Sequence, residues 1–121
     1  VTLPNTITII GEEAFSDCDN LTSITIPDSV TSIGDSAFYN CSSLTSINIP
    51  DSVTTICYKA FGFCKSLRKI IIPLSVKTME GDVFIHCDYL KVYCRATAEP
   101  YDWHYSWDNY VDDVIWGYTG N

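Results

Sequence analysis

The chain has 121 residues, of which 46% are hydrophobic, and carries a formal net charge of −8 at pH 7. This length is typical of one domain and supplies enough apolar side chains for a sizeable core. The negative charge argues against nucleic-acid binding, which usually needs a clustered basic surface. No segment approaches the roughly 20 consecutive apolar residues of a membrane-spanning helix, so we expect no membrane insertion of this segment.

Prolines and cysteines recur every 23 positions along most of the chain. They are Pro4, Pro27, Pro50 and Pro73, and Cys18, Cys41, Cys64 and Cys87. Recurrence at a fixed interval of this length is typical of a solenoid, in which each unit buries its apolar side against the next unit.

The apolar positions align from unit to unit. The chain opens inside a first, partial unit that contains Val1, Leu3, Ile7, Ile10, Ala14 and Phe15. The second contains Leu21, Ile24, Ile26, Val30, Ile33, Ala37 and Phe38, and the third contains Leu44, Ile47, Ile49, Val53, Ile56, Ala60 and Phe61. The fourth contains Leu67, Ile70, Ile72, Val76, Met79, Val83 and Phe84. The partial start indicates a fragment of a longer protein.

Each unit predicts the same path around one coil. Residues 21–26 alternate inward Ile24 and Ile26 with outward Thr25, as a strand buried on one face does. Pro27 ends this strand because it cannot donate to a ladder. Residues 30–33 form a second short strand, and Gly34 permits a sharp turn. Residues 37–38 then begin one helical turn directed into the core.

The repeat ends near residue 95, so we divide the chain into repeats (1–95) and a C-terminal capping segment (96–121). Residues 91–94 arrive without a proline, and the apolar pattern fits best if one residue is deleted there. The capping segment holds all three tryptophans. A solenoid needs such a lid, because its final coil would otherwise expose apolar side chains and strand edges to water.

The repeated pattern LxxIxIPxxVxxIxxxAFxxCxx is similar to the BspA-like leucine-rich repeats, over Val1 to Cys94. Residues 93–96, followed by Trp103 and Trp107, resemble the closing segment of that family. The resemblance implies a β-rich α/β repeat solenoid: a leucine-rich repeat stack with parallel strands, short helical turns and an aromatic C-terminal cap. It also implies a secreted or cell-surface location and a non-enzymatic, adhesin-like module that binds proteins or glycans.

Charge is unevenly distributed, which indicates where binding takes place. Residues 1–58 contain seven acids and no base, whereas residues 59–95 contain all seven bases and only three acids. Solvated solenoid faces also vary freely in charge, but the outward strand positions in the basic zone form a partly apolar cluster. We predict that an extracellular protein or glycan, an anionic one in particular, binds this cluster. Its residues are Arg68, Lys69, Ile71, Lys91 and Tyr93.

Two other functions fit the same sequence. The aromatic residues of the cap can stack on sugar faces, and these residues are Tyr101, Trp103, Tyr105 and Trp107. Alternatively, the array is a structural spacer that holds another domain away from the cell.

The cysteines and histidines do not indicate a metal, a cofactor or catalysis. Strands stack about 4.8 Å apart, so four periodic cysteines extend over roughly 14 Å and cannot surround one ion. We expect a buried column of thiols beside the periodic phenylalanines. Cys57 and Cys94 break the pattern and are expected on different coil faces, which favours free thiols over a bond between them. His86 occupies a variable loop position and His104 lies among the cap aromatics, and neither indicates a catalytic base.

Overall fold

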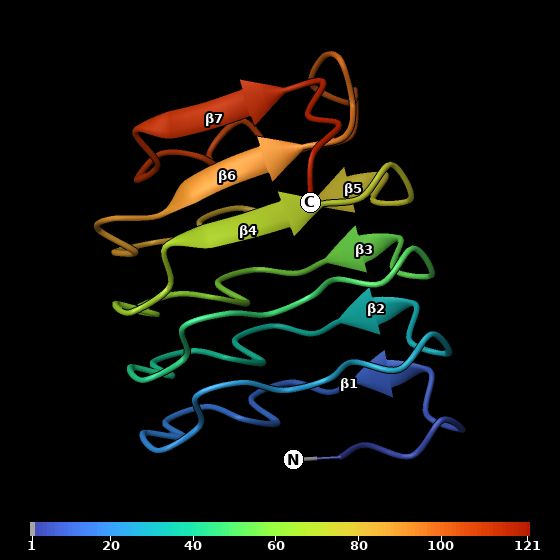
Figure 1. Cartoon of the computed structure of the whole chain (residues 1–121), viewed down its shortest axis with the longest axis vertical. Helices are drawn as coiled ribbons and strands as arrows, with labels where there is room; N and C mark the ends of the chain where they lie inside the picture. Colours follow the sequence, from blue (N-terminus) through green and yellow to red (C-terminus); the bar gives the residue numbers. More distant parts are fainter. Residues whose placement is uncertain (1) are drawn as a thin grey trace.

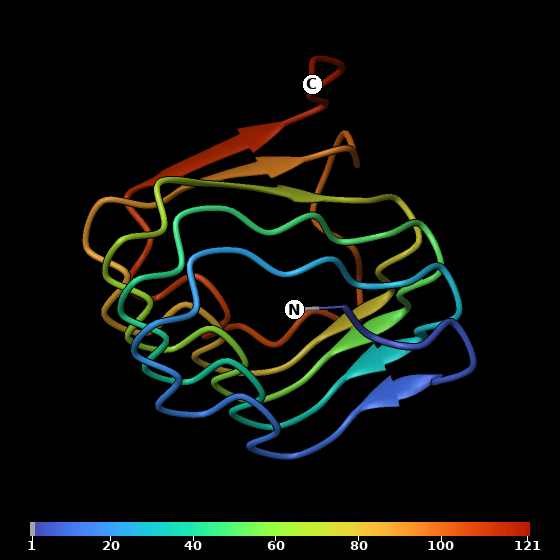
Figure 2. The same ribbon diagram turned by 60° about the horizontal axis from the view of Figure 1, so that its bottom comes forward.

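The chain winds into a stack of similar coils (Figure 1). The structure is a computed structural model that describes residues 2–121, so the predicted repeat position of Val1 lies outside them. In an oblique view from the first coil, the coils follow one another along similar closed paths, and the strands lie on two sides of the path (Figure 2). This arrangement confirms the solenoid predicted from the repeat interval.

Two parallel sheets run along the stack, one on each side of the coil. The first has the order β1-β2-β3-β5 and consists of Ile9–Ile10, Ser32–Ile33, Thr55–Ile56 and Thr78–Met79. The second has the order β4-β6-β7 and consists of Lys69–Ile72, Lys91–Cys94 and Asp113–Trp116. Every strand pair is parallel, because each coil returns to the same direction.

The register of both sheets follows the repeat. Ile33 in β2 lies opposite Ile56 in β3, which occupies the same position of the next unit. In the second sheet Ile72 lies opposite Cys94, which comes one position earlier than the repeat interval requires. The single-residue deletion predicted before residue 94 therefore lies in the unit that forms β6, and Cys94 takes the place of a strand isoleucine.

The two predicted strands of each unit are not equally regular. The strand predicted at residues 30–33 is present as β2. The strand predicted at residues 21–26 pairs with the next coil only through a single bridge between Thr25 and Asn48. Ile24 and Ile26 still point inward and are buried. The same path becomes a four-residue strand only at β4.

The prediction of short helical turns is wrong, since no helix occurs within residues 2–121. In residues 34–41 the backbone N–H of Ala37 donates to Gly34 O, three residues back, at 3.1 Å. The N–H of Phe38 instead donates to Ala60 O in the next coil, at 2.8 Å. Beyond its first turn, an α-helix bonds each N–H to the carbonyl oxygen four residues back in its own segment. Ser36 and Asn40 also adopt positive φ angles, which interrupt a right-handed helix.

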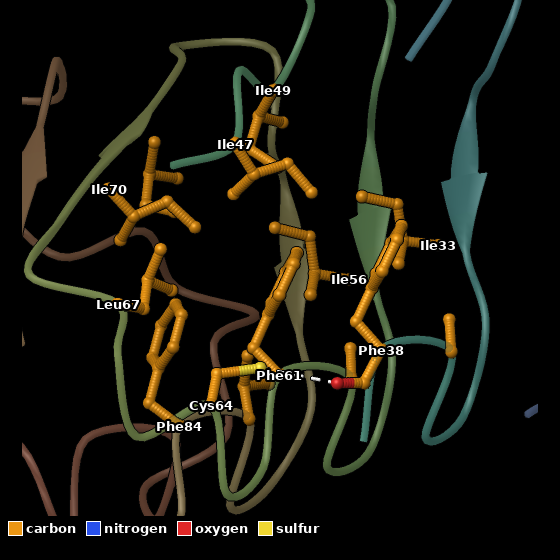
Figure 3. Packing of buried hydrophobic residues seen from close by; sticks show 14 of the residues in the cluster. Ile33, Phe38, Ile47, Ile49, Ile56, Phe61, Cys64, Leu67, Ile70 and Phe84 are labelled. Atoms are coloured by element: carbon orange, nitrogen blue, oxygen red, sulfur yellow. Dashed lines mark hydrogen bonds between the residues drawn. The ribbon is translucent and has the colours of Figure 1, made fainter. Parts of the chain in front are cut away.

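A column of parallel phenylalanine rings forms the centre of the core (Figure 3). The rings of Phe38 and Phe61 stack with centroids 5.3 Å apart, and those of Phe61 and Phe84 with centroids 5.8 Å apart. These three side chains are fully buried, whereas Phe15 in the first coil is half-buried. The predicted common burial of the periodic phenylalanines is therefore confirmed for the inner coils.

The periodic cysteines form a second column and also connect the coils. Cys41, Cys64 and Cys87 are buried, as the sequence predicts, and Cys18 is half-buried at the first coil. The Cys64 thiol donates to Phe38 O at 3.2 Å, and the Cys87 thiol donates to Phe61 O at 3.0 Å (Figure 3 draws the first). Each thiol thus packs as a small apolar group and contributes a weak hydrogen bond to the preceding coil.

Replacing Phe61 by alanine tests the phenylalanine column. The change removes a fully buried ring between two others, so the free energy of unfolding should fall by about 3–5 kcal/mol. Chemical denaturation monitored by circular dichroism measures this loss. Phe15→Ala is the matched control and should cost clearly less, because Phe15 is half-exposed. Equal losses at the two positions would contradict the column.

Stability should also fall at alkaline pH, because burial raises the pKa of the Cys41 thiol from 9.0 to about 11 and that of Cys94 to about 12. Above pH 9 the unfolded chain releases these protons while the folded chain retains them, so their contribution is present below pH 9 and is lost as pH rises towards 12. Denaturation midpoints at pH 7.5, 9 and 10.5, under reducing conditions, measure this decline.

The control for the alkaline decline is Cys94→Ala, which removes one titrating thiol and leaves the tyrosines and lysines unchanged. The decline between pH 9 and pH 10.5 should be smaller in this variant than in the unchanged chain. The two proteins are compared by how steeply their stability changes with pH. The loss of packing that the substitution itself causes therefore does not affect the comparison. An identical slope in both proteins would show that the Cys94 thiol does not contribute.

Candidate binding surfaces

The predicted binding residues lie on the outer face of the sheet β4-β6-β7. Side chains alternate along each strand, and Ile70 and Val92 point into the core. The outward residues of β4 and β6 are therefore Lys69 beside Lys91, and Ile71 beside Tyr93. The strand β7 extends the same rows with Asp113 and Ile115. Four of the five predicted residues thus lie in two adjacent rows.

Lys69 is already bound by the end of the chain. Its Nζ donates to Tyr118 Oη at 3.1 Å and to Asn121 O at 2.8 Å. It also lies over the rings of Tyr93 and Tyr118, 5.0 and 5.2 Å from their centroids. The two rings themselves are 4.5 Å apart. Lys69 therefore fastens residues 117–121 to the sheet, and Figure 2 shows the C-terminus outside the coil on this side.

The remaining cations are more accessible. Arg68 is exposed, lies 4.9 Å over the exposed ring of Tyr89 and donates to Lys65 O at 2.9 Å. Lys91 is exposed between its strand neighbours Lys69 and Asp113. A hollow of about 270 Å³ adjoins this part of the face. It is lined by polar and aliphatic residues that include Thr45, Ser46, Asn48, Arg68, Lys69, Ile71 and Asn121.

Sequence reasoning missed the contribution of residues 117–121 to this surface. Arg95 donates to Tyr118 O at 3.0 Å and lies over the same ring, so two cations hold Tyr118. The turn that brings Tyr118 back is made at Gly117, which has a φ of 68°. A glycine after an apolar strand is a turn signal in the sequence, but it does not indicate which face the chain then covers.

The aromatic cap divides into buried and exposed residues. Trp103 and Trp107 are 5% and 1% exposed and pack edge to face, 4.9 Å apart. Trp116 lies 5.7 Å from Trp103, so the three tryptophans form one cluster. Tyr101 and Tyr105 are 100% and 84% exposed. Of the four cap aromatics predicted as an alternative site, a ligand can reach only these two tyrosines.

The capping segment forms a further coil rather than a separate lid. Its strand β7 pairs with β6, and Trp103 bridges to Met79 of the first sheet. The ring of Trp107 lies 6.3 Å from Phe84 and continues the phenylalanine column. Both indole N–H groups are satisfied, by Val76 O at 3.2 Å and by Glu99 Oε1 at 2.7 Å. The large indole rings thus cover the last core layer.

One group of potential metal ligands occurs among residues 2–121, where Asp35, Cys57 and Glu80 place ligand atoms within 4.8 Å of one another. Both carboxylates accept the N–H of Tyr58, at 3.2 and 3.1 Å, and this shared bond accounts for their convergence. Burial and the adjacent Glu80 raise the pKa of the Cys57 thiol to about 11, which keeps it protonated at neutral pH. Cys57 therefore lacks the character of a reactive thiol.

The other residues considered for chemistry lie apart from one another. Cys94 is buried in β6, while Cys57 follows β3 of the other sheet, and both are free thiols. The His86 ring lies between those of Phe63 and Tyr110, 4.7 and 5.0 Å from their centroids. His104 accepts or donates a 2.8 Å hydrogen bond with Ser106 Oγ. The arrangement gives both histidines structural contacts.

The parallel coils, the buried apolar columns and the outward polar positions define a leucine-rich repeat solenoid. Residues 1–99 match the family described as BspA type Leucine rich repeat region, in six copies. The chain belongs to this family, and nothing in the match points to catalysis.

Solved bacterial proteins share the fold. The chain is 30% identical to a leucine rich cell surface protein from Faecalibacterium prausnitzii A2-165, with a TM-score of 0.81, and the match covers 98% of this chain and 32% of that one. It is 31% identical to the T. pallidum Leucine Rich Repeat protein, with a TM-score of 0.74, and the match covers 97% and 51% respectively. The chain thus spans about a third to a half of these relatives.

A third solved relative is a leucine-rich repeat protein from Bacteroides capillosus ATCC 29799, which is 38% identical, with a TM-score of 0.66. That match covers 78% of this chain and 70% of the other. No curated protein matches the chain. Within residues 2–121 there is no helix of the length and apolarity needed to cross a membrane.

Removing residues 100–121 tests the role of the capping coil. The truncation uncovers Phe84 and the edge of β6, which Trp107 and β7 otherwise cover. We expect self-association and loss of cooperative unfolding, because an open strand edge above an apolar layer recruits other chains. Light scattering after size exclusion and thermal denaturation measure both effects. Tyr101→Ala, at a fully exposed position in the same segment, should change neither. A truncated chain that stays monomeric with an unchanged melting temperature would contradict the capping role.

Proposed function

We propose that this chain is a non-catalytic binding module of a secreted or cell-surface protein, and that it binds an anionic protein or glycan through the outer face of β4 and β6. The membership in the BspA-type family supports a binding or structural module. The cell-surface name of the Faecalibacterium relative supports the location. The side chains of the outer face support the choice of this surface.

Charge is the observation that carries the choice of surface. Arg68 and Lys91 are exposed on adjacent coils in a protein of net charge −8. Neighbouring strands lie about 4.8 Å apart, so these two cations meet the same partner. The ammonium of Lys69, which Tyr118 and Asn121 hold, adds to the positive charge of the face. A local positive potential on an acidic protein steers anionic partners to that face and repels them from others.

The same face offers shape and apolar area in addition to charge. Ile71 and Tyr93 form a half-buried row beside the cations. The hollow between the sheet and Asn121 adjoins Arg68 and provides a recess of about 270 Å³ for part of a partner. A spacer needs only a uniformly polar face. The combination of positive charge, apolar area and a recess therefore favours binding over the spacer function.

Charge reversal tests the proposal. Lys91→Glu and Arg68→Glu should each weaken the capture of heparin, and together by about tenfold or more at low salt, since tenfold corresponds to about 1.4 kcal/mol. The effect should shrink as salt is added, because exposed charges are screened. Surface plasmon resonance on immobilised heparin, desulfated heparin and poly-glutamate measures affinity and distinguishes glycan from acidic polypeptide.

Lys77→Glu is the matched control, because Lys77 is an exposed lysine beside β5 of the other sheet. It makes the same change in net charge and should leave binding nearly unchanged. An equal loss in Lys77→Glu and Lys91→Glu would indicate a response to total charge alone. Binding that is indifferent to both Arg68→Glu and Lys91→Glu would overturn the assignment of this surface.

A further inference from the structure

A second recess lies at the end of β5, where the last repeat coil meets the capping coil. Its volume is about 710 Å³, within the range of small-ligand sites. The strand β5 belongs to the other sheet from β4 and β6, so this recess is separate from the surface proposed above. The side chains that give it its chemistry are Tyr58, Glu80, Asp82, Asp102 and Tyr105.

Gly81 lines the recess. In the repeat register it occupies the position held by Asp35 and Tyr58 in the two preceding coils. A Cβ atom at Gly81 would lie 2.7 Å from Ser106 Oγ, so the next coil packs closely against the glycine. Ser106 therefore fills the place that a side chain at Gly81 would take, and the recess lies beside this contact, lined by Tyr58 of the coil before and Tyr105 of the coil after.

Two exposed rings and three carboxylates line this space. Tyr58 is 44% exposed and has the Lys59 ammonium over its ring, whereas Tyr105 stacks on His104, with centroids 4.3 Å apart, and is still 84% exposed. The uncovered side of the Tyr105 ring is therefore open to a ligand. Glu80, Asp82 and Asp102 give the lining a formal charge of −3, and no lysine or arginine of the described residues 2–121 is among the lining side chains. Aromatic faces attract cations, and carboxylates pair with them through charge-assisted hydrogen bonds.

The protein already holds one of its own cations at the edge of this recess. The Lys59 ammonium lies 5.0 Å from the centroid of the Tyr58 ring. Its hydrogen bond with Tyr58, together with the nearby Asp82 carboxylate, raises the pKa of Lys59 above its usual value. The Tyr58 side chain and the Asp82 carboxylate therefore favour positive charge at this place.

We propose that the recess binds the guanidinium group of an arginine side chain that a protein partner presents. A guanidinium is planar, so it stacks on a tyrosine face, and its fork of N–H groups matches a carboxylate in a way that a lysine ammonium does not. The carboxylates favour a cation over a neutral sugar, because only a cation pairs with them through charge-assisted hydrogen bonds between opposite charges. This site differs from the anion-binding face in charge and position, and it does not depend on the proposed function.

The test uses the unchanged chain and three small probes: N-acetyl-arginine amide, the lysine analogue and the citrulline analogue. Citrulline keeps the shape of arginine and lacks its charge. Titration of each into ¹⁵N-labelled protein, followed by NMR, measures affinity and locates the shifted amides. We expect the arginine probe to bind at least about fivefold more tightly than the other two, with shifts confined to residues 58, 78–82 and 102–109. A methyl glycoside serves as the sugar comparison.

Two exposed positions provide variants that leave the core intact. Asp102→Asn removes one charge and Tyr105→Ala removes one ring, and each should weaken the arginine probe about threefold or more. The matched controls are Asp112→Asn and Tyr101→Ala, an exposed acid and an exposed ring outside the recess, which should have no effect. Glu80 is left unchanged because it accepts the N–H of Tyr58.

Three outcomes would overturn the proposal. Equal affinity for the citrulline and arginine probes would show that the recess does not recognise charge. Equal affinity for the lysine and arginine probes would show that it does not recognise the planar guanidinium group. Binding of the methyl glycoside without the arginine probe would assign the recess to sugars. Loss of heparin binding in the Arg68 and Lys91 variants, with arginine binding retained, would confirm that the two surfaces act independently.

Discussion

Parallel hydrogen bonding between successive coils is the constraint on which the rest of this structure depends. The bond from Ser36 N to Tyr58 O joins one coil to the next, and strand partners such as Ile33 and Ile56 occupy the same position of successive units. Since neighbouring strands must lie about 4.8 Å apart, one coil has to contain a fixed number of residues. An insertion or deletion is tolerated only where the chain leaves the ladder, as it does before β6.

Fixed spacing has a consequence for the side chains. Residues one repeat apart lie above one another, so an inward position must suit its own column along the whole stack. The phenylalanine rings stack at 5.3 Å, and the cysteine thiols fill the narrower column beside them. Outward positions do not have this restriction. The two surfaces proposed here accordingly lie where a column changes its residue type, at Arg68 and at Gly81.

The inward half of the structure was predictable from the sequence because periodicity specifies it directly. The columns of Phe38 and Cys64, the inward Ile24 and the replacement of an isoleucine by Cys94 all follow from alignment of the units. The turn at residues 34–41 was not predictable in the same way. Ala37 and Phe38 suit a helix, but the bonds of Phe38 to the next coil and the positive φ of Ser36 depend on tertiary stacking, which overrides local preference.

The outward half shows what one-dimensional alignment leaves out. Alignment of the units placed Lys69 and Tyr93 correctly on one face. It gave no indication that Tyr118 and Asn121 return to that face, because residues 117–121 have no repeat to align with. It also grouped Trp103 with Tyr105 as cap aromatics, although one is buried and the other exposed. Both differences arise in the last coil, where each inward position must close the core and each outward position is free to bind. The boundary between repeat and cap is therefore where the sequence least specifies function, and both surfaces proposed here include residues from beyond it.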